Sequence, residues 1–284
     1  MGRSAISRHD SPLGRWTRAF YFPDAPLAAH VDLFWYVSGR ANFTRDRRLP
    51  TGRTHLLFNL GSPALLFERD ANATAREFAT SWIAGQQDSY IETGAQGDTV
   101  LLGAQFSGHG AYRLLRIAQH ELCGRVIGLE ALLGDQVGRL RERLLEAAGP
   151  DACFALLERW LLALLARGKP VHADVVAAEH AAQREPATLR TRKLSRDLGV
   201  SEAHLIRLFR EQVGLTPKAY AGILRFGRAL GQARRARASW AQIAADCGYY
   251  DQAHLANAFQ RYAGRTPTSL LRARMPDADS IVIA

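Results

Sequence analysis

Two stretches near the C-terminus repeat each other at an offset of 50 residues. The first runs from Ser201 to Pro217 and the second from Asp251 to Pro267. The residues that return are Ala203, His204, Leu205, Phe209, Gly214, Thr216 and Pro217, as Ala253, His254, Leu255, Phe259, Gly264, Thr266 and Pro267. A repeat of this kind indicates one structural unit that is used twice.

Each repeated stretch has the local signals of a helix that follows a tight turn. Gly199 supplies the left-handed backbone that a short helix-helix turn needs, and Ser201 is a good N-cap for the next helix. Gly248 and Asp251 take the same places in the second stretch. This layout is that of a helix-turn-helix. The predicted elements are one unit at about 188–214, a joining helix at about 218–237 and a second unit at about 240–264.

The positive charge of the chain is concentrated around the repeat. From Arg184 to the C-terminus there are 17 Lys and Arg against 8 Asp and Glu, a net charge of +9, whereas residues 1–183 carry a net charge of +1. A basic region beside a neutral one is typical of a protein that binds nucleic acid. Charge alone would also fit an acidic partner or a membrane surface, but the helix-turn-helix layout favours double-stranded DNA.

The stretch from Thr188 to Leu271 resembles the DNA-binding domain of the AraC/XylS family of transcription regulators. The matching motifs are Leu205-x-Arg207-x-Phe209, Gly214-x-Thr216-Pro217, Leu224-Arg225-Phe226, Ile243-Ala-x-x-x-Gly248-Tyr-x-Asp251-Gln252-x-His254-Leu255-x-x-x-Phe259 and Gly264-x-Thr266-Pro267. The resemblance implies two helix-turn-helix units joined by a long helix. Each unit would place a recognition helix in the major groove, at neighbouring segments of one duplex.

The resemblance also implies which side chains meet the bases. By position they are Ala203, Ile206, Arg207, Gln252, Ala253, Ala256 and Asn257. Arg207 can make a bidentate contact to guanine, and Gln252 and Asn257 can each make one to adenine. The alanines and Ile206 can meet only a thymine methyl group or a sugar. The family often has Arg where this chain has Asn257, which leaves the second helix short of positive charge.

Further polar residues are expected to contact the DNA backbone. They are Ser201, His204, Arg210, Thr216, Lys218, Arg234, Arg235, Arg237, His254 and Thr266. Lysine and arginine contacts of this kind add affinity that depends on salt and not on sequence. For the arginines of the joining helix, a solvated surface position is an equally good interpretation. Leu205, Phe209, Leu255 and Phe259 are predicted to be core.

The N-terminal part has the pattern of a β-rich domain followed by helices. Short apolar runs separated by Gly, Pro, Asn and Asp continue to about residue 110 and favour a sandwich or barrel. Helical periodicity follows, with leucine stripes over about 129–145 and 154–165. The predicted fold class is α+β. The predicted parts are a cupin-like sensor or dimerisation domain at 1–167, an all-α DNA-binding domain at 168–275 and a tail at 276–284.

The N-terminal domain also resembles a sensor-like domain, of unassigned ligand, in one group of the same family. The matching pieces are Leu49-Pro-x-Gly52-x-x-x-Leu56-Leu57-Phe58-Asn59-Leu60, Ile83-Ala-Gly85 and Phe106-x-x-x-Gly110-Ala-Tyr112. The resemblance implies that this domain binds a small effector or mediates dimerisation. An apolar pocket would be lined by Trp35, Phe58, Trp82 and Phe106, unless these aromatics are simply core. The leucine stripes would form a homodimer seam or pack on their own domain.

Other chemistry has little support in the sequence. The histidines and Cys123, Cys153 and Cys247 are scattered, so we expect no metal, no cofactor and no disulfide framework. The sequence has no nucleophile elbow, phosphate loop or dinucleotide fingerprint. It has no visible signal peptide and no apolar run long enough to span a bilayer, so we expect a cytoplasmic protein without membrane contact.

Together these patterns predict a sequence-specific DNA-binding transcription regulator, not an enzyme, that is modulated by a small-molecule effector at the N-terminal domain. RNA polymerase and a second copy of the chain are candidate further partners. One alternative is a ligand-independent regulator whose N-terminal domain only dimerises. The other is a cupin-like enzyme domain fused to a DNA-binding module.

Overall fold

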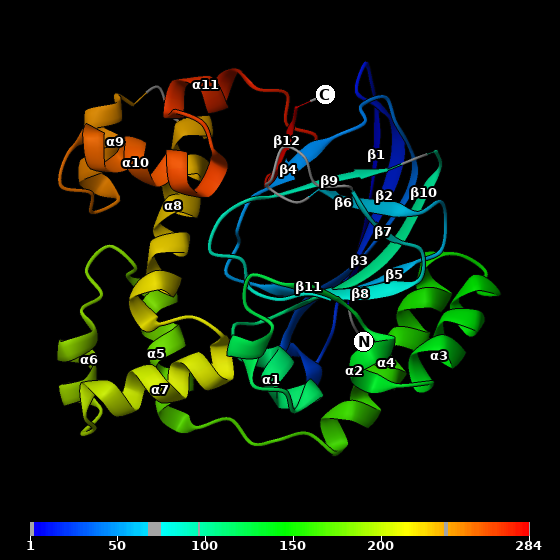
Figure 1. Cartoon of the computed structure of the whole chain (residues 1–284), viewed down its shortest axis with the longest axis horizontal. Helices are drawn as coiled ribbons and strands as arrows, with labels where there is room; N and C mark the ends of the chain where they lie inside the picture. The colour runs from blue at the N-terminus through cyan, green and yellow to red at the C-terminus, as the bar shows by residue number, and fades with distance from the viewer. Residues whose placement is uncertain (1–2, 68–74, 96, 236–237, 284) are drawn as a thin grey trace.

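The structure is a computed structural model that describes residues 3–67, 75–95, 97–235 and 238–283. Its N-terminal half forms two antiparallel sheets that face each other (Figure 1). The large sheet has the strand order β1-β2-β3-β10-β5-β8-β11. Its strands are β1 (Arg3–Ser11), β2 (Gly14–Phe22), β3 (Val31–Ala41), β10 (Thr99–Phe106), β5 (Thr54–Asn59), β8 (Ser81–Ala84) and β11 (Val126–Gly128). A sandwich of this kind is what the short, turn-separated apolar runs predict.

The small sheet contains a strand from the far end of the chain. Its order is β12-β4-β9-β6-β7, with β4 (Asp46–Arg48), β9 (Ile91–Ala95), β6 (Ala64–Phe67), β7 (Arg76–Phe78) and β12 (Ser280–Val282). β12 lies in the segment 276–284 that the sequence analysis treats as a tail. The C-terminus therefore returns to the N-terminal sheets.

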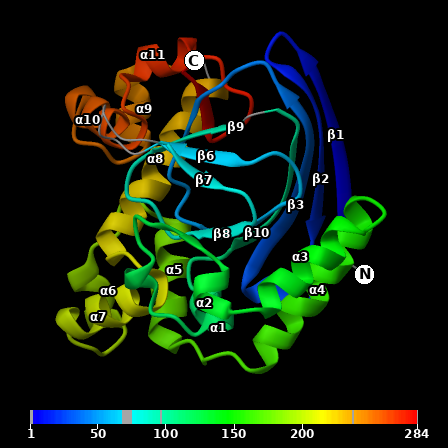
Figure 2. The ribbon, with the colours of Figure 1, turned by 45° about the vertical axis from the view of Figure 1, so that its right-hand side comes forward.

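Helices cover one face of the large sheet (Figure 2). They are η1 (Leu27–Ala29), α1 (Gly110–Leu115), η2 (Gln119–Glu121), α2 (Glu130–Leu133), α3 (Gln136–Leu145) and α4 (Pro150–Ala166). Because side chains alternate along a strand, Leu56 and Phe58 of β5 point to the same face, where they meet this helical layer. The leucine stripes of α3 and α4 are buried in this core, so they pack on their own domain.

The predicted single helix over 129–145 is wrong in one detail. The chain forms α2 and α3 instead, and Gly134 between them has a positive φ of 67°. A glycine in this conformation ends a helix because it satisfies the left-handed turn without a Cβ clash.

The C-terminal half is helical, and its order matches the predicted repeat. The helices are α5 (Ala173–Arg184), α6 (Thr191–Asp197), α7 (Glu202–Val213), α8 (Pro217–Arg235), α9 (Trp240–Asp246), α10 (Gln252–Ala263) and α11 (Pro267–Arg272). α6 with α7, and α9 with α10, form the two helix-turn-helix units. Gly199 and Gly248 make the turns, each at φ +72°. The long helix α8 joins the units.

The helical half lies beside the sheets, and α8 runs along that side of the N-terminal half (Figure 1). One continuous core cluster joins α5, α7, α8, α9 and α10 to Leu49, next to β4, and to Ile281 of β12. Gly52 is close enough to Tyr220 of α8 that a Cβ there would lie 3.1 Å from the ring. The two halves therefore share buried surface, and no bare linker separates them in the described residues.

Candidate nucleic-acid interface and effector cavity

The first recognition helix, α7, is fixed by its caps and by its inward face. The Ser201 hydroxyl accepts a hydrogen bond from the His204 amide at 3.2 Å, and Gly214 ends the helix in the left-handed region at φ 98°. Leu205 and Phe209 are fully buried, as predicted. Their burial leaves the other side of α7 free to meet a ligand.

The predicted base-contacting residues of α7 lie on this outer side. Ala203 and Arg207 are exposed, and Ile206 is half-buried. The Arg207 side chain is 63% exposed, lies 3.8 Å from Glu211 and places Nη2 3.3 Å from His204 Nδ1. Both contacts join residues three or four positions apart on the surface of one helix, so they hold the guanidinium only weakly.

The second recognition helix, α10, repeats this construction. The Asp251 carboxylate accepts a hydrogen bond from the His254 amide at 2.7 Å, and Gly264 ends the helix at φ 63°. Gln252, Ala253 and Asn257 are exposed and Ala256 is half-buried. Leu255 and Phe259 are fully buried. The two helices thus present equivalent faces.

Both recognition helices rest on the N-terminal half by their C-terminal ends. Gly214 at the end of α7 packs on the Gln119 backbone, where a Cβ would lie 3.0 Å from the carbonyl oxygen. At the end of α10, Arg47 donates to the carbonyls of Ala263 and Gly264, each at 3.2 Å. The N-terminal ends of both helices therefore face away from the sheets (Figure 1).

The predicted DNA-backbone residues divide into helix caps, exposed cations and arginines with contacts inside the protein. Ser201, Thr216 and Thr266 cap α7, α8 and α11 through their hydroxyls. Arg210 and Lys218 are exposed. His254 Nδ1 accepts from the Tyr250 amide at 3.3 Å, so this histidine braces the turn before α10.

The arginines at the end of α8 have contacts of their own. Arg234 donates to the Ala278 carbonyl at 3.4 Å, and Arg235 donates to Gly231 within the helix at 3.1 Å. Arg237 lies outside the described residues.

Tyr250 is a surface feature that the sequence analysis did not select. It stands between Gly248 and the Asp251 cap, and 94% of it is exposed. Its neighbour Tyr249 is buried under the Arg225 guanidinium. The signal in the sequence is a bulky aromatic at the turn position where the first unit has Val200.

A cavity of about 590 Å³ lies between the two sheets. Trp35 and Trp82, two of the predicted pocket residues, line it. Gly103 of β10 lies directly under the Trp35 ring, because a Cβ there would lie 2.3 Å from the ring. The absence of a side chain at Gly103 lets the indole lie against the sheet.

The other two predicted pocket residues, Phe58 and Phe106, are misplaced by the sequence analysis. Both are fully buried in the core under the helices, where Phe58 packs edge-on against Trp160. Their neighbours Leu57 and Gln105 line the cavity instead. The reason is the alternation of a strand, since a shift of one residue sends a side chain to the opposite face.

One part of the cavity wall is charged. Asp277 accepts from Arg18 at 3.0 Å and from Arg48 at 3.1 Å, and Arg48 also pairs with Asp46 at 3.0 Å. Burial and the neighbouring Asp277 carboxylate raise the pKa of Asp279 to about 7. Burial, with Arg48 and Arg53 nearby, lowers the pKa of His55 to about 4. The wall therefore holds a closely balanced set of charges.

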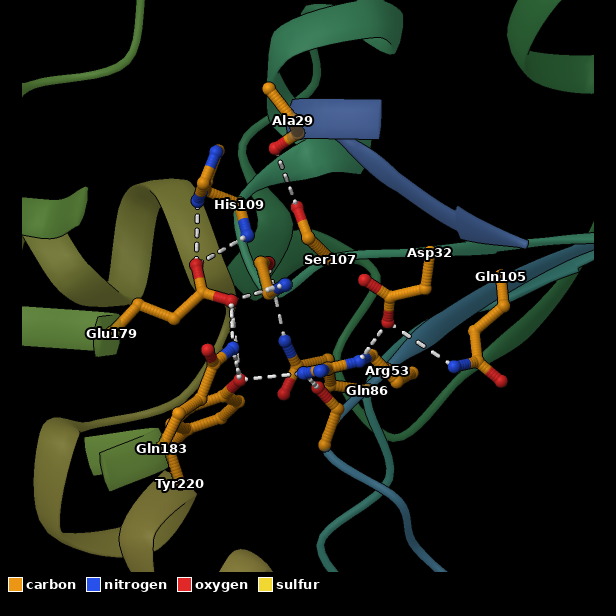
Figure 3. A network of polar contacts seen from close by, with 12 residues as sticks. Ala29, Asp32, Arg53, Gln86, Gln105, Ser107, His109, Glu179, Gln183 and Tyr220 are labelled. Carbon is orange, nitrogen blue, oxygen red and sulfur yellow. Dashed lines mark hydrogen bonds and ion pairs between the residues drawn. The ribbon is translucent and has the colours of Figure 1, made fainter. Parts of the chain in front are cut away.

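A buried polar network ties α5 and α8 to the sheets (Figure 3). Its centre is Glu179 of α5, which is 1% exposed. Glu179 accepts from the amides of Gly108 and His109 at 2.8 and 3.2 Å, and His109 Nδ1 lies 2.5 Å from its Oε2. Gln183 and Tyr220 also donate to it, at 2.8 and 3.3 Å.

The network fixes the charge of Glu179 and continues into the large sheet. Burial alone would raise the pKa of Glu179, but the hydrogen bonds from His109 and Gly108 hold it below its ordinary value. Arg53 donates to Tyr220 at 2.8 Å and pairs with Asp32. No local pattern in the sequence marks this set, because its members are far apart in the chain.

Within the ranges that the structure describes, no group of three or more His, Cys, Asp or Glu side chains is arranged to hold a metal ion. In the same ranges, no helix combines the length and the apolar character needed to cross a membrane.

Two family models match the chain. Residues 194–273 match a family described as "Helix-turn-helix domain", and residues 19–128 match a "Domain of unknown function (DUF6597)". No curated protein matches. The C-terminal region is thus an AraC-type helix-turn-helix domain, which confirms the resemblance found in the sequence, and it follows a domain whose family has no assigned function.

The chain also matches several solved structures, of which three follow. The C-terminal domain of AraT from Geobacillus stearothermophilus is 22% identical, with a TM-score of 0.36 over 38% of this chain and 92% of that chain. An AraC-type regulator from Chromobacterium violaceum is 26% identical, with a TM-score of 0.32 over 34% and 87%. ToxT from Vibrio cholerae is 10% identical, with a TM-score of 0.44 over 83% and 96%. A DNA-binding role in transcription regulation rests on the matched helix-turn-helix domain.

Proposed function

We propose that this chain is a sequence-specific transcription regulator that acts in the cytoplasm and reads two neighbouring segments of DNA under the control of a small molecule. The observation that carries the proposal is the pair of equivalent recognition helices. α7 and α10 are capped alike, bury the equivalent Leu and Phe positions and expose the equivalent outer positions. RNA polymerase and a second copy of the chain stay predicted partners.

The test is selection of bound duplexes from a random pool by the full-length protein at near-physiological salt. Two enriched blocks about one helical turn (~10 bp) apart are expected, because the two units enter successive major grooves. A single block would mean that one helix only positions the protein. If no sequence is enriched in the presence or absence of a metabolite extract, the proposed function is wrong.

Arg207→Ala should weaken binding to the selected duplex by about 1–3 kcal/mol and remove the preference for guanine at one position. The reason is that Arg207, whose side chain is 63% exposed, is the predicted base-contacting residue of α7 that can donate two hydrogen bonds to guanine. The measurement is titration of the selected duplex and of duplexes with each base at that position. Arg210→Ala is the matched control, since this exposed arginine of the same helix is predicted to touch phosphate and should weaken all duplexes equally. Equal loss on all duplexes for Arg207→Ala would assign it to the backbone.

We propose that Tyr250 donates its hydroxyl to a phosphate beside the second recognition helix. Tyr250→Phe should then weaken binding by about 0.5–1.5 kcal/mol on every duplex, the usual contribution of one hydrogen bond. Stability should not change, because the side chain is 94% exposed. Titration of specific and random duplexes measures the effect, and thermal unfolding controls for it. Unchanged affinity in both Tyr250→Phe and Tyr250→Ala would remove Tyr250 from the interface.

We propose that the effector binds in the cavity between the sheets. The cavity volume of about 590 Å³ lies in the usual range for small-molecule sites, and its walls are largely apolar with a few convergent charges. This feature favours an effector over a domain that only dimerises. A thermal-shift screen of metabolites would test it, with Trp35→Ala as the variant that should abolish any shift. Shifts that survive in Trp35→Ala would place the ligand elsewhere.

A further inference from the structure

The segment after α11 connects the second DNA-binding unit to the sheets, and we name residues 274–283 the C-terminal strap. β12 within it pairs with β4, with Ser280 opposite Arg48 and Val282 opposite Asp46. The Leu49 amide donates to the Asp279 carbonyl at 2.7 Å, and Ile281 is fully buried. The strap is therefore an integral part of the small sheet.

The strap is also part of the cavity wall. Its residues 276–279 line the cavity together with Arg18 and Arg48. Asp277 of the strap accepts from both of these arginines, at 3.0 and 3.1 Å. The strap thus places its own carboxylate on the two cations that a ligand in the cavity would meet.

The same segment is tied to the DNA-binding half. It follows α11 directly, and Arg234 at the end of α8 donates to the Ala278 carbonyl at 3.4 Å. A change in the position of the strap would therefore act on the end of the joining helix and on the second helix-turn-helix unit. That unit also meets the N-terminal half through the shared core cluster, through Arg47 at the end of α10, and through the exposed pair of Arg261 with Asp88.

The charged side chains of the cavity wall indicate the charge of a ligand that could replace the strap there. With the strap in place, Arg18 and Arg48 face Asp46 and Asp277, and the pKa of Asp279, raised to about 7, leaves that carboxyl only partly charged at neutral pH. Without the strap, the two arginines would face Asp46 alone. One negative charge on a ligand would restore the balance, and the apolar walls would hold its body.

Resting on the function proposed above, we propose that the effector is an apolar monoanion whose acidic group displaces Asp277 from Arg18 and Arg48. The strap then leaves the small sheet, and the second DNA-binding unit loses the part of its restraint that the strap supplies. The strap acts as an internal competitor of the ligand. This device needs no movement of the first unit, which is held through Glu179 and Tyr220.

Two fluorescent probes that differ in charge test the proposal on the full-length protein without DNA. Anilinonaphthalene sulfonate carries one negative charge, and N-phenylnaphthylamine has a similar aromatic body without it. Asp277→Asn should bind the sulfonate about tenfold more tightly than the wild type, because the competing charge is gone, and Arg18→Gln should bind it about tenfold more weakly. The neutral probe should bind all three proteins alike. Asp10→Asn is the control, since Asp10 pairs with Arg15 on the exposed surface.

Hydrogen exchange of the strap gives the second readout. The sulfonate should lower the protection of the amides of Leu49, Val282 and Ile283, which bond into or across the strap, and Asp277→Asn should lower it without any probe. Equal sulfonate affinity in all variants, no binding of the sulfonate, or unchanged protection on binding would each overturn the proposal. These readouts use no DNA, so failure of the duplex selection would refute the proposed function separately.

Discussion

Glu179→Ala is expected to lower the free energy of unfolding by about 3–5 kcal/mol, because it removes the acceptor of several buried hydrogen bonds at once. The substitution would leave His109 and the amides of Gly108 and His109 buried without their acceptor. It would also remove the acceptor that Tyr220 of α8 shares with Gln183. The substitution should weaken the contact of α5 and α8 with the sheets most.

Urea unfolding followed by tryptophan fluorescence measures this loss, and hydrogen exchange locates it. Glu185→Ala is the matched control, because Glu185 is an exposed carboxylate just after the same helix, and it should change stability by less than about 0.5 kcal/mol. Glu179→Gln keeps the shape and should recover part of the loss. If the Glu179→Ala protein is as stable as the control, the network makes no net contribution to the free energy of unfolding.

The lowered pKa of Glu179 also determines how acid affects the contact of α5 and α8 with the sheets. The pKa of Glu179 in the folded protein lies below its ordinary value, so the unfolded chain binds the proton more readily. The stability contributed by the carboxylate is present above the unfolded pKa and is lost as the pH falls through the folded one. Glu179→Gln should therefore flatten the acid limb of a stability curve. An acid limb identical to that of the wild type would contradict this role.

Phe226→Ala is expected to cost about 3–5 kcal/mol and to remove the second DNA-binding unit selectively. Phe226 of α8 is 1% exposed, and its ring lies 5.1 Å from that of Phe259 and 5.2 Å from that of Tyr262. Both partners belong to α10. Removal of the ring would leave a cavity under the recognition helix and release it from the joining helix.

Duplex selection distinguishes a local effect from general unfolding. Phe226→Ala should keep the first enriched block and lose the second, while Phe209→Ala, whose ring packs 5.7 Å from Tyr220 under α7, should lose the first. Phe22→Ala is the control, because that ring is 43% exposed and lies in β2. If both core variants lose both blocks at a temperature where each is folded, the two units are not independent readers.

The helical half could be predicted closely because its signals are local. Ser201 and Asp251 accept the amides three residues ahead, and Gly199, Gly214, Gly248 and Gly264 have the left-handed backbone expected of them. Caps and glycine turns depend on neighbours within a few residues, so the sequence carries them directly. The periodicity of Leu205 and Phe209 likewise needs only the pitch of one helix.

The sequence by itself therefore determined the repeated unit, its caps and its outward-facing residues, and also the β-rich character of the first half. Only the tertiary structure decided which strand faces line the cavity, that Glu179 is buried among amides about 70 residues away, and that residues 280–282 complete the small sheet. These features depend on strand register and on contacts between distant segments. Such contacts are set by how whole layers pack, and a short stretch of sequence carries no mark of them.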